Sequence, residues 1–196
     1  GTSIVRFTAV GGGIAGANPS VFNVVQVQSA GTLTLDVVDD VTVTGANLPA
    51  APDDVGLLVR AGGTLSLGAS ATLRLGQGLS IGRSATQGGT FLSAGAAPKI
   101  IDTGSRFAFD VFGGTVDIDR LIFTNPNAAG LRINDTTNYA VDADNIDFVG
   151  GVSVNGIYLN LRYTTISAGR FNFSGCSFDL NCQYNVHTEP GGGIYD

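Results

Sequence analysis

Three segments in the second half of the chain share one pattern of apolar and polar residues. They are residues 116–123, 141–148 and 166–173, each 25 residues after the one before. Apolar and polar residues alternate in each segment, and the alternation shifts by one position at Arg120, Asn145 and Arg170. Alternation predicts a strand with one buried face, and the shift predicts a bend before a second short strand.

A Gly-Thr-apolar step marks the start of each unit. It begins at Gly31, Gly63, Gly89 and Gly114, at spacings of 32, 26 and 25 residues. Two looser copies follow, at 140–141 and 165–166, again at steps of 25. Self-similarity at a fixed period is the sequence signature of a repeat architecture.

A third short strand precedes each pair. The equivalent segments are residues 57–59, 79–81, 107–109, 131–133 and 157–159. A single unit of three strands cannot bury its own inward side chains, whereas units stacked about 4.8 Å apart pair every strand with its neighbours. The predicted fold is therefore all-β: a right-handed single-stranded parallel β-helix (β-solenoid) with about 25 residues and three short strands per coil.

Stacking of equivalent positions predicts ladders of like side chains. The expected ladders are Val116, Val141 and Ile166 on one inner face; Phe123, Phe148 and Phe173 on another; and Asp110, Asn134 and Asn160 at the bends. The alternative is an antiparallel β-sandwich, whose strands also recur every 8–12 residues or so. The repetition of residue class at 25 favours the solenoid.

The chain is expected to form one solenoid domain over residues 1–196, as part of a longer protein. Residues 1–20 and 183–196 lack the pattern and are expected to be an irregular opening segment and an irregular tail. Residues 46–54 contain two prolines and predict a loop that lengthens one repeat. No domain boundary is evident inside the chain.

The composition narrows the range of partners. Charged residues make up 13% of the chain, against roughly 25% in ordinary soluble domains. The formal net charge is −6 and the ten basic residues are scattered, which argues against nucleic acid. No apolar run approaches the roughly 20 residues of a membrane-spanning helix, so no membrane insertion is expected.

From Val24 to Phe178 the chain resembles the right-handed parallel β-helix superfamily, the pectin-lyase-like group. That group includes polysaccharide lyases and hydrolases, phage tailspikes and bacterial surface adhesins. The segments Gly-Thr-Leu-Thr-Leu at 31–35 and Gly-Gly-Thr-Leu-Ser-Leu at 62–67 are most similar to the repeats of the adhesin-like and fibre-like branch. The resemblance is one of architecture, and architecture alone does not decide function.

No complete catalytic motif is present. Polygalacturonase-like hydrolases carry an Asn-Thr-Asp step, an Asp pair, a Gly-His-Gly and an Arg-Ile-Lys on adjacent coils. This chain has Asp39-Asp40 without a partner one coil away, and Arg132-Ile133-Asn134 with Asn where Lys is needed. Its one histidine, His187, falls in the tail. We therefore expect no enzyme activity.

Four aspartates form the candidate metal site. Asp117 and Asp142 should stack one coil apart, as should Asp119 and Asp144. Like charges at about 5 Å repel, and a bound Ca²⁺, which takes six to eight oxygen ligands, would relieve that repulsion. The alternative is four exposed carboxylates that keep the sheet soluble.

Two further pairs complete the candidate sites. Cys176 and Cys182 enclose five residues and could close a disulfide loop in an oxidising compartment, or could remain two thiols. Tyr158 is expected to present its ring on the outside beside Arg132, which makes these two residues candidates for glycan binding. Tyr139 and Tyr163 are also expected to be exposed.

The leading functional hypothesis is a structural or adhesive extracellular module, a rigid rod or filament subunit on a cell surface or virion. Open solenoid ends expose unpaired strands, so self-association or continuation of the solenoid is expected. One alternative is a carbohydrate-active β-helix fragment, a polysaccharide lyase or hydrolase. Another is a calcium-dependent module that binds a surface polysaccharide.

Overall fold

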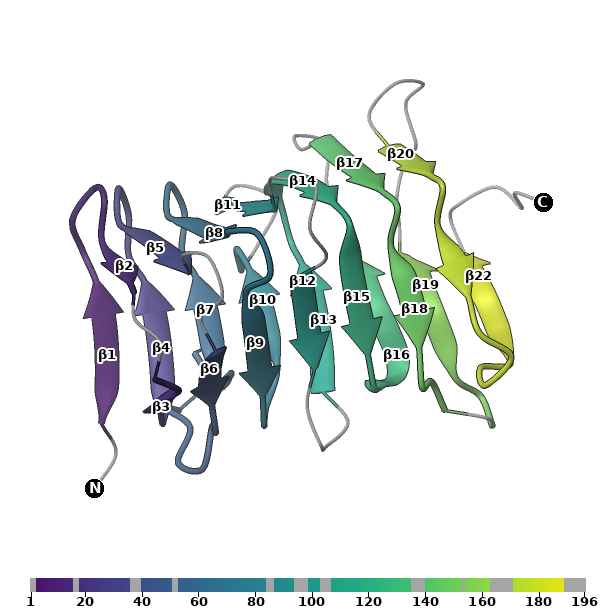
Figure 1. Cartoon of the computed structure of the whole chain (residues 1–196), viewed down its shortest axis with the longest axis horizontal. Helices are drawn as coiled ribbons and strands as arrows, with labels where there is room; N and C mark the ends of the chain where they lie inside the picture. Colours follow the sequence, from purple (N-terminus) through teal and green to yellow (C-terminus); the bar gives the residue numbers. More distant parts are fainter. Residues whose placement is uncertain are drawn as a thin grey trace.

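The computed structural model describes residues 3–15, 18–35, 40–50, 53–83, 87–93, 99–102, 107–134, 140–152, 154–162 and 171–188. Within them every regular element is a β-strand. The strands form three sheets, and the pairings within each sheet are parallel. The chain visits the three sheets in turn, and we call one visit to all three a circuit (Figure 1).

Each circuit adds one strand to each sheet. Sheet A has the order β1 (Ile4–Phe7), β4 (Val24–Val27), β7 (Leu57–Val59), β10 (Leu79–Ile81), β13 (Phe107–Val111), β16 (Pro126–Ile133), β19 (Ile157–Leu161) and β22 (Tyr184–Thr188). Sheet B has the order β2 (Gly13–Ile14), β5 (Thr32–Leu35), β8 (Thr64–Leu67), β11 (Gly89–Ser93), β14 (Gly114–Asp119), β17 (Ala140–Asp144) and β20 (Phe171–Ser174). Sheet C has the order β3 (Ser20–Phe22), β6 (Asp40–Val43), β9 (Thr72–Leu75), β12 (Lys99–Asp102), β15 (Leu121–Thr124), β18 (Asp147–Val149) and β21 (Ser177–Phe178).

The predicted all-β class with parallel strands is confirmed, together with the predicted register of the Gly-Thr step and of the segments 116–123 and 141–148. Thr32, Thr64, Thr90 and Thr115, the threonines of the Gly-Thr steps, pair in order along sheet B. Val116 pairs with Val141, and Phe123 pairs with Phe148. Parallel pairing at these positions places like side chains directly over one another.

The glycine of the repeated step has a steric cause. A Cβ built on Gly31 would lie 2.1 Å from the carbonyl oxygen of Phe7, one circuit below. On Gly63 it would lie within 3.0 Å of three carbonyl oxygens, and on Gly114 it would lie 1.8 Å from that of Gly89. The turn from sheet A into sheet B therefore passes so close to the preceding circuit that a side chain does not fit.

The bend between sheets B and C is made by one residue in the left-handed region. Arg120 and Asn145 both have φ of 55°, at the two positions where the alternation shifts. In the last circuit the equivalent residue is Gly175, with φ of 64°. Arg170, predicted for that role, lies outside the described residues.

The register predicted for the last repeat is wrong. Val141 pairs with Phe171 and Phe148 pairs with Phe178, each 30 residues later, while Phe173 pairs with Ala143 in sheet B. The last circuit is thus five residues longer than the one before, and 171–174 alternates as well as 166–169 does. Ile166 lies outside the described residues.

Three further expectations need correction, one about register and two about the ends of the pattern. In sheet A, Leu79 and Leu131 both pair with Phe109 rather than Phe107, and Leu131 pairs with Leu159 rather than Ile157. The equivalent segments are therefore 109–111 and 159–161, each two residues later than predicted. Residues 1–20, expected to be irregular, contain β1, β2 and the start of β3, which form the first circuit. The expected irregular tail contains β22, which pairs with β19.

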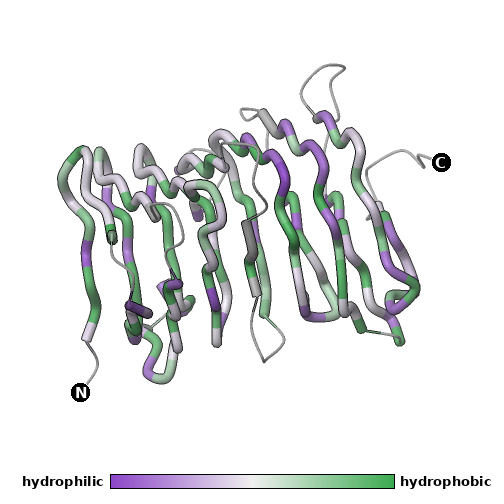
Figure 2. Tube along the Cα trace, in the orientation of Figure 1, coloured by the Kyte–Doolittle hydropathy of each residue, from purple (hydrophilic) through white to green (hydrophobic). Residues whose placement is uncertain are grey.

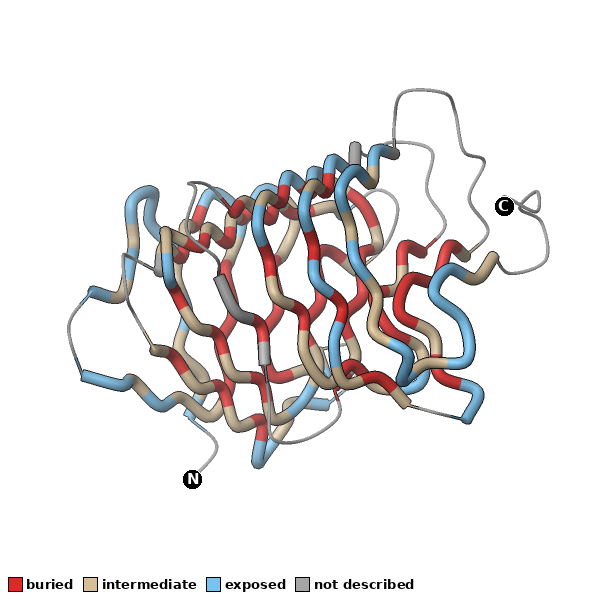
Figure 3. The backbone as a smooth tube through the Cα atoms, turned by 45° about the vertical axis from the view of Figure 1, so that its right-hand side comes forward, coloured by how far each residue is buried: buried red, intermediate tan, exposed pale blue. Residues whose placement is uncertain are grey.

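The core is the space enclosed by the three sheets. In many of the strands, such as β6, β8, β9 and β15, alternate residues are buried there, as the red positions of Figure 3 show, and apolar and polar positions alternate along much of the trace in Figure 2. From β1 to β10 the buried apolar residues are valine, leucine, isoleucine and alanine. From β11 onward phenylalanines join them, and their rings form a connected series through Phe91, Phe109, Phe123 and Phe148.

Candidate functional site

The outward-facing side of sheet A differs from that of sheet B because much of it is covered. One residue per strand forms an outer ladder, in the order Arg6, Gln26, Leu58, Ser80, Asp110, Arg132, Asn160 and His187. Five of these residues are no more than 7% exposed: Gln26, Leu58, Ser80, Asp110 and Asn160. On sheet B, by contrast, outward Asp117 and Asp142 are exposed.

Part of the cover is the segment that connects β6 to β7. Asp53 in this segment accepts a hydrogen bond from Gln26 at 3.5 Å and forms an ion pair with Arg60. The neighbouring Asp54 lies 3.6 Å from Arg83. The end of the predicted loop, at Asp53 and Asp54, therefore lies against sheet A and brings two carboxylates to the ends of β7 and β10.

Asp110 is the centre of a second polar group. It accepts hydrogen bonds from Arg132 at 2.5 Å and from Asn134 at 3.0 Å. The predicted ladder of Asp110, Asn134 and Asn160 is wrong in register, because Asp110 and Asn160 flank Arg132 on either side. Asn134 still reaches Asp110 because it follows β16 directly.

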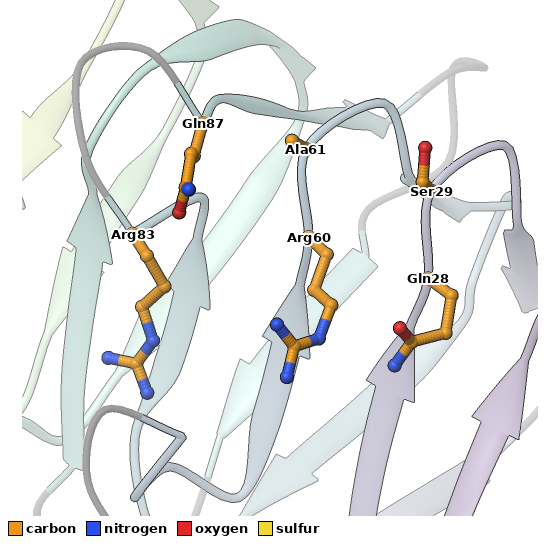
Figure 4. Close-up of a pocket in the computed structure, with 6 residues that line it drawn as sticks. All are labelled: Gln28, Ser29, Arg60, Ala61, Arg83 and Gln87. Atoms are coloured by element: carbon orange, nitrogen blue, oxygen red, sulfur yellow. The ribbon is translucent and has the colours of Figure 1, made fainter.

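Two adjoining pockets open on this face. The first, of about 220 Å³, is lined by Gln28, Ser29, Arg60, Ala61, Arg83 and Gln87 (Figure 4). The second, of about 380 Å³, has Arg83, Asp54, Asp110 and Arg132 among its lining residues. Arg83 belongs to both, so the two pockets form one polar surface along the stack. The sequence reasoning missed Arg60 and Arg83, although both follow predicted sheet A strands closely.

Arg132 lies on this surface, but its predicted companion does not. Tyr158, expected to be exposed, is fully buried, and its ring contacts those of Phe148 and Phe178. Its hydroxyl accepts a hydrogen bond from the amide of Gly151 and donates one to Asp179. The end of the core accommodates the ring and the buried hydroxyl has partners, so Tyr158 offers no stacking surface to a sugar. Tyr139 and Tyr163 lie outside the described residues.

The four aspartates stack as predicted. Asp117 pairs with Asp142, and Asp119 pairs with Asp144. Side-chain amides approach them from the next circuit: Asn172 donates to Asp142 at 2.9 Å, and Asn145 donates to Asp119 at 3.1 Å. Within the described ranges, no three His, Cys, Asp or Glu side chains are grouped so that they could hold a metal ion. These amide hydrogen bonds stabilise the negative charges of Asp142 and Asp119 without a bound cation.

The predicted disulfide is not formed in this structure, where Cys176 and Cys182 are both half-buried thiols. The two sulfurs face different neighbours: Cys176 donates to the carbonyl oxygen of Ala143 at 3.5 Å, whereas the Sγ of Cys182 lies beside Gly151. Both side chains pack on the end of the core. They act there as small apolar residues, which is common for cysteine.

The Cys176 thiol is expected to react slowly. Burial, with the nearby carboxylates of Asp144 and Asp147, raises its pKa. A raised pKa leaves less thiolate at any pH below it, and the thiolate is the reactive form. In the variant Cys182→Ser, iodoacetamide at pH 8 should therefore label Cys176 more slowly in the folded protein than in urea. Equal rates would contradict the slow reaction expected of a buried thiol with a raised pKa. A wild-type mass showing the loss of two hydrogens in the absence of reductant would contradict the assignment of two thiols.

The fragments of hydrolase motifs are not brought together. Asp40 begins β6 and forms an ion pair with Arg74 at 3.1 Å, while its neighbour Asp39 lies outside the described residues. His187 lies in β22, beside Asn160, and its ring is 5.6 Å from that of Tyr184. Asp40 is on sheet C and His187 on sheet A at the C-terminal end.

Comparison with known proteins adds no assignment. No protein-family model matches the chain, and neither curated proteins nor solved structures give a significant match. The described residues contain no helix long and apolar enough to cross a membrane. The protein belongs to the all-β class, and its described strands form three sheets, each made of parallel strands.

Proposed function

We propose that the chain is a right-handed parallel β-helix, of the pectin-lyase-like architecture, that works as a structural or adhesive module: a rigid rod or filament subunit. The observation that carries this proposal is the continuous parallel pairing of eight strands in sheet A, from β1 to β22. Hydrogen bonds between circuits run along the stack, as do the shared core contacts. A solenoid of this kind resists bending because each circuit is fixed to the next over all three sheets.

The two ends support lengthwise association. In the part of the chain that the structure describes, β1 and β22 each have one edge without a paired strand. Val186 in β22 continues the core position of Leu159 but is 42% exposed, and Tyr184 is 44% exposed. Nearby Leu180 is 98% exposed. Such an edge offers both backbone groups and apolar side chains to another circuit.

Placement outside the cell or on a virion is part of the same proposal. It rests on the resemblance to adhesin-like and fibre-like solenoids and on a surface that depends on neutral polar residues rather than charge. Its expected partners are further solenoid circuits, from the same chain or from another copy.

The association is tested by sedimentation over a range of protein concentrations. The wild type should form elongated oligomers, and Val186→Lys should shift them toward monomer because a lysine on an edge strand opposes pairing. Val149→Lys is the matched control, since Val149 is 40% exposed but lies on β18, between two paired strands. A wild type that stays monomeric and soluble at high concentration would count against lengthwise assembly.

A further inference from the structure

Two arginines from consecutive circuits line one pocket. Arg60 directly follows β7, and Arg83 comes two residues after β10; Gln28 follows β4 at the position equivalent to Arg60. Figure 4 shows the side chains of Gln28, Arg60 and Arg83 next to one another and extending in the same direction. The backbone amide of Arg83 donates to the carbonyl oxygen of Gln87 at 3.3 Å, which holds Gln87 at the rim. The lining residues carry two positive charges and no negative charge.

These guanidinium groups have unused hydrogen-bonding capacity. Among the described residues, no acceptor lies within hydrogen-bonding distance of the buried Nε of Arg60 or of the buried Nε and Nη2 of Arg83. Asp53 accepts a hydrogen bond from the Nη2 of Arg60 but not from its Nε. Asp54 is 3.6 Å from the Nη2 of Arg83, beyond hydrogen-bond range, and its side chain is 56% exposed. The two arginines also give the pocket two positive charges, and no carboxylate is among its lining residues, so a ligand that brings acceptor oxygens would be favoured there.

We propose that the Arg60–Arg83 pocket binds a carboxylate, sulfate or phosphate group of a ligand that lies on the outer face of sheet A. The guanidinium fork matches the oxygens of such groups, and two forks side by side favour a group with several oxygens. Gln28, Ser29 and Gln87 supply neutral polar contacts around it. The pocket, at about 220 Å³, is smaller than the site of a drug-sized ligand, so it suits one charged group or one small ring.

The aspartates of the covering segment then act as internal competitors. Asp53 and Asp54 place their carboxylates beside the same two arginines that would receive the ligand. Removing the charge of Asp54 should free Arg83 without removing any group that contacts the ligand. A gain of affinity in Asp54→Asn is therefore expected, and loss of folding could not produce such a gain. This proposal does not depend on the rod function, because a rod or an isolated module could carry the same pocket.

The test is calorimetric titration of the wild type and three variants with defined anions. The probes are inorganic sulfate, inorganic phosphate, and matched sulfated and carboxylated oligosaccharides, with a neutral oligosaccharide as control. Arg83→Gln should weaken binding of the preferred anion by about tenfold or more, the effect of losing a charged hydrogen bond. Arg74→Gln, on sheet C, should leave binding unchanged, and Asp54→Asn should tighten it. Thermal melting of each variant checks the fold.

The outcomes separate the sources of the anionic group. Tight binding of a free ion alone identifies a small-anion site, whereas preference for one oligosaccharide identifies a glycan that carries that group. Equal weakening by Arg83→Gln and Arg74→Gln would overturn the proposal, because it would indicate general charge attraction. Failure of the wild type to bind any of the anions at millimolar concentration would overturn it as well. Neither result affects the sedimentation test of lengthwise assembly.

Discussion

Phe148→Ala is expected to lower the free energy of unfolding by about 3–5 kcal/mol, the usual range for removing a fully buried phenylalanine. The Phe148 ring lies 5.0 Å from that of Phe178 in a stacked arrangement and 5.7 Å from that of Phe123 edge to face. It also contacts Tyr158. The substitution therefore opens a cavity that joins three successive circuits, and each circuit loses a contact.

Urea denaturation followed by far-ultraviolet circular dichroism measures this effect. Val149→Ala is the matched control, because the adjacent residue faces outward and is 40% exposed. Its effect should stay within about 0.5 kcal/mol. A loss below about 1 kcal/mol for Phe148→Ala would mean that the ring is not held in a packed core, and it would contradict the stacked register of β15, β18 and β21.

Gly114→Ala is expected to cost about 2–5 kcal/mol, from a steric and a conformational contribution together. The new Cβ would lie 1.8 Å from the carbonyl oxygen of Gly89, which belongs to the backbone of the neighbouring strand and cannot rotate away. Gly114 also has φ of +102°, a conformation that alanine adopts with strain. The loss should appear as a lower urea midpoint.

Gly11→Ala separates the two contributions. Gly11 has φ of +78°, but an added Cβ would meet no atom within 4 Å. This variant should show only the conformational cost of about 1–2 kcal/mol. If Gly11→Ala and Gly114→Ala were equally destabilising, the close approach of consecutive circuits at the Gly-Thr step would not be the reason for the repeated glycine.

The repeat predicted the parallel stacking of strands because the residue class itself recurs. The Gly-Thr step fixed the positions of Thr32, Thr64, Thr90 and Thr115, although one spacing is 32. The repeat gave the wrong register in the last circuit, where segments beginning at Ile166 and at Phe171 both alternate as a strand would. Alternation specifies which face is buried but not which of two similar segments pairs with the previous circuit. Alternation alone therefore does not reveal extra residues between two strands.

The candidate site was predicted less well than the fold. Arg132 was identified, but its pairing with Tyr158 rested on aligning residues 157–159 with 131–133. Arg132 instead pairs with Asn160, and the ring of Tyr158 lies in the end of the core with its hydroxyl hydrogen-bonded. Arg60 and Arg83 become significant only when the end of the β6–β7 segment lies against sheet A and the two side chains share a pocket. No local pattern encodes that position, because it depends on the path of a loop rather than on strand periodicity.

The uneven distribution of aromatic residues along the stack determines what spectroscopy can detect. The chain has no tryptophan, and its five tyrosines all lie at position 139 or later. Buried phenylalanines likewise begin at Phe91, whereas the core from β4 to β10 is aliphatic. Tyrosine fluorescence therefore reports only on the C-terminal end. A molecule that frays from its N-terminal end would lose amide-exchange protection there while its fluorescence still resembled that of the intact protein.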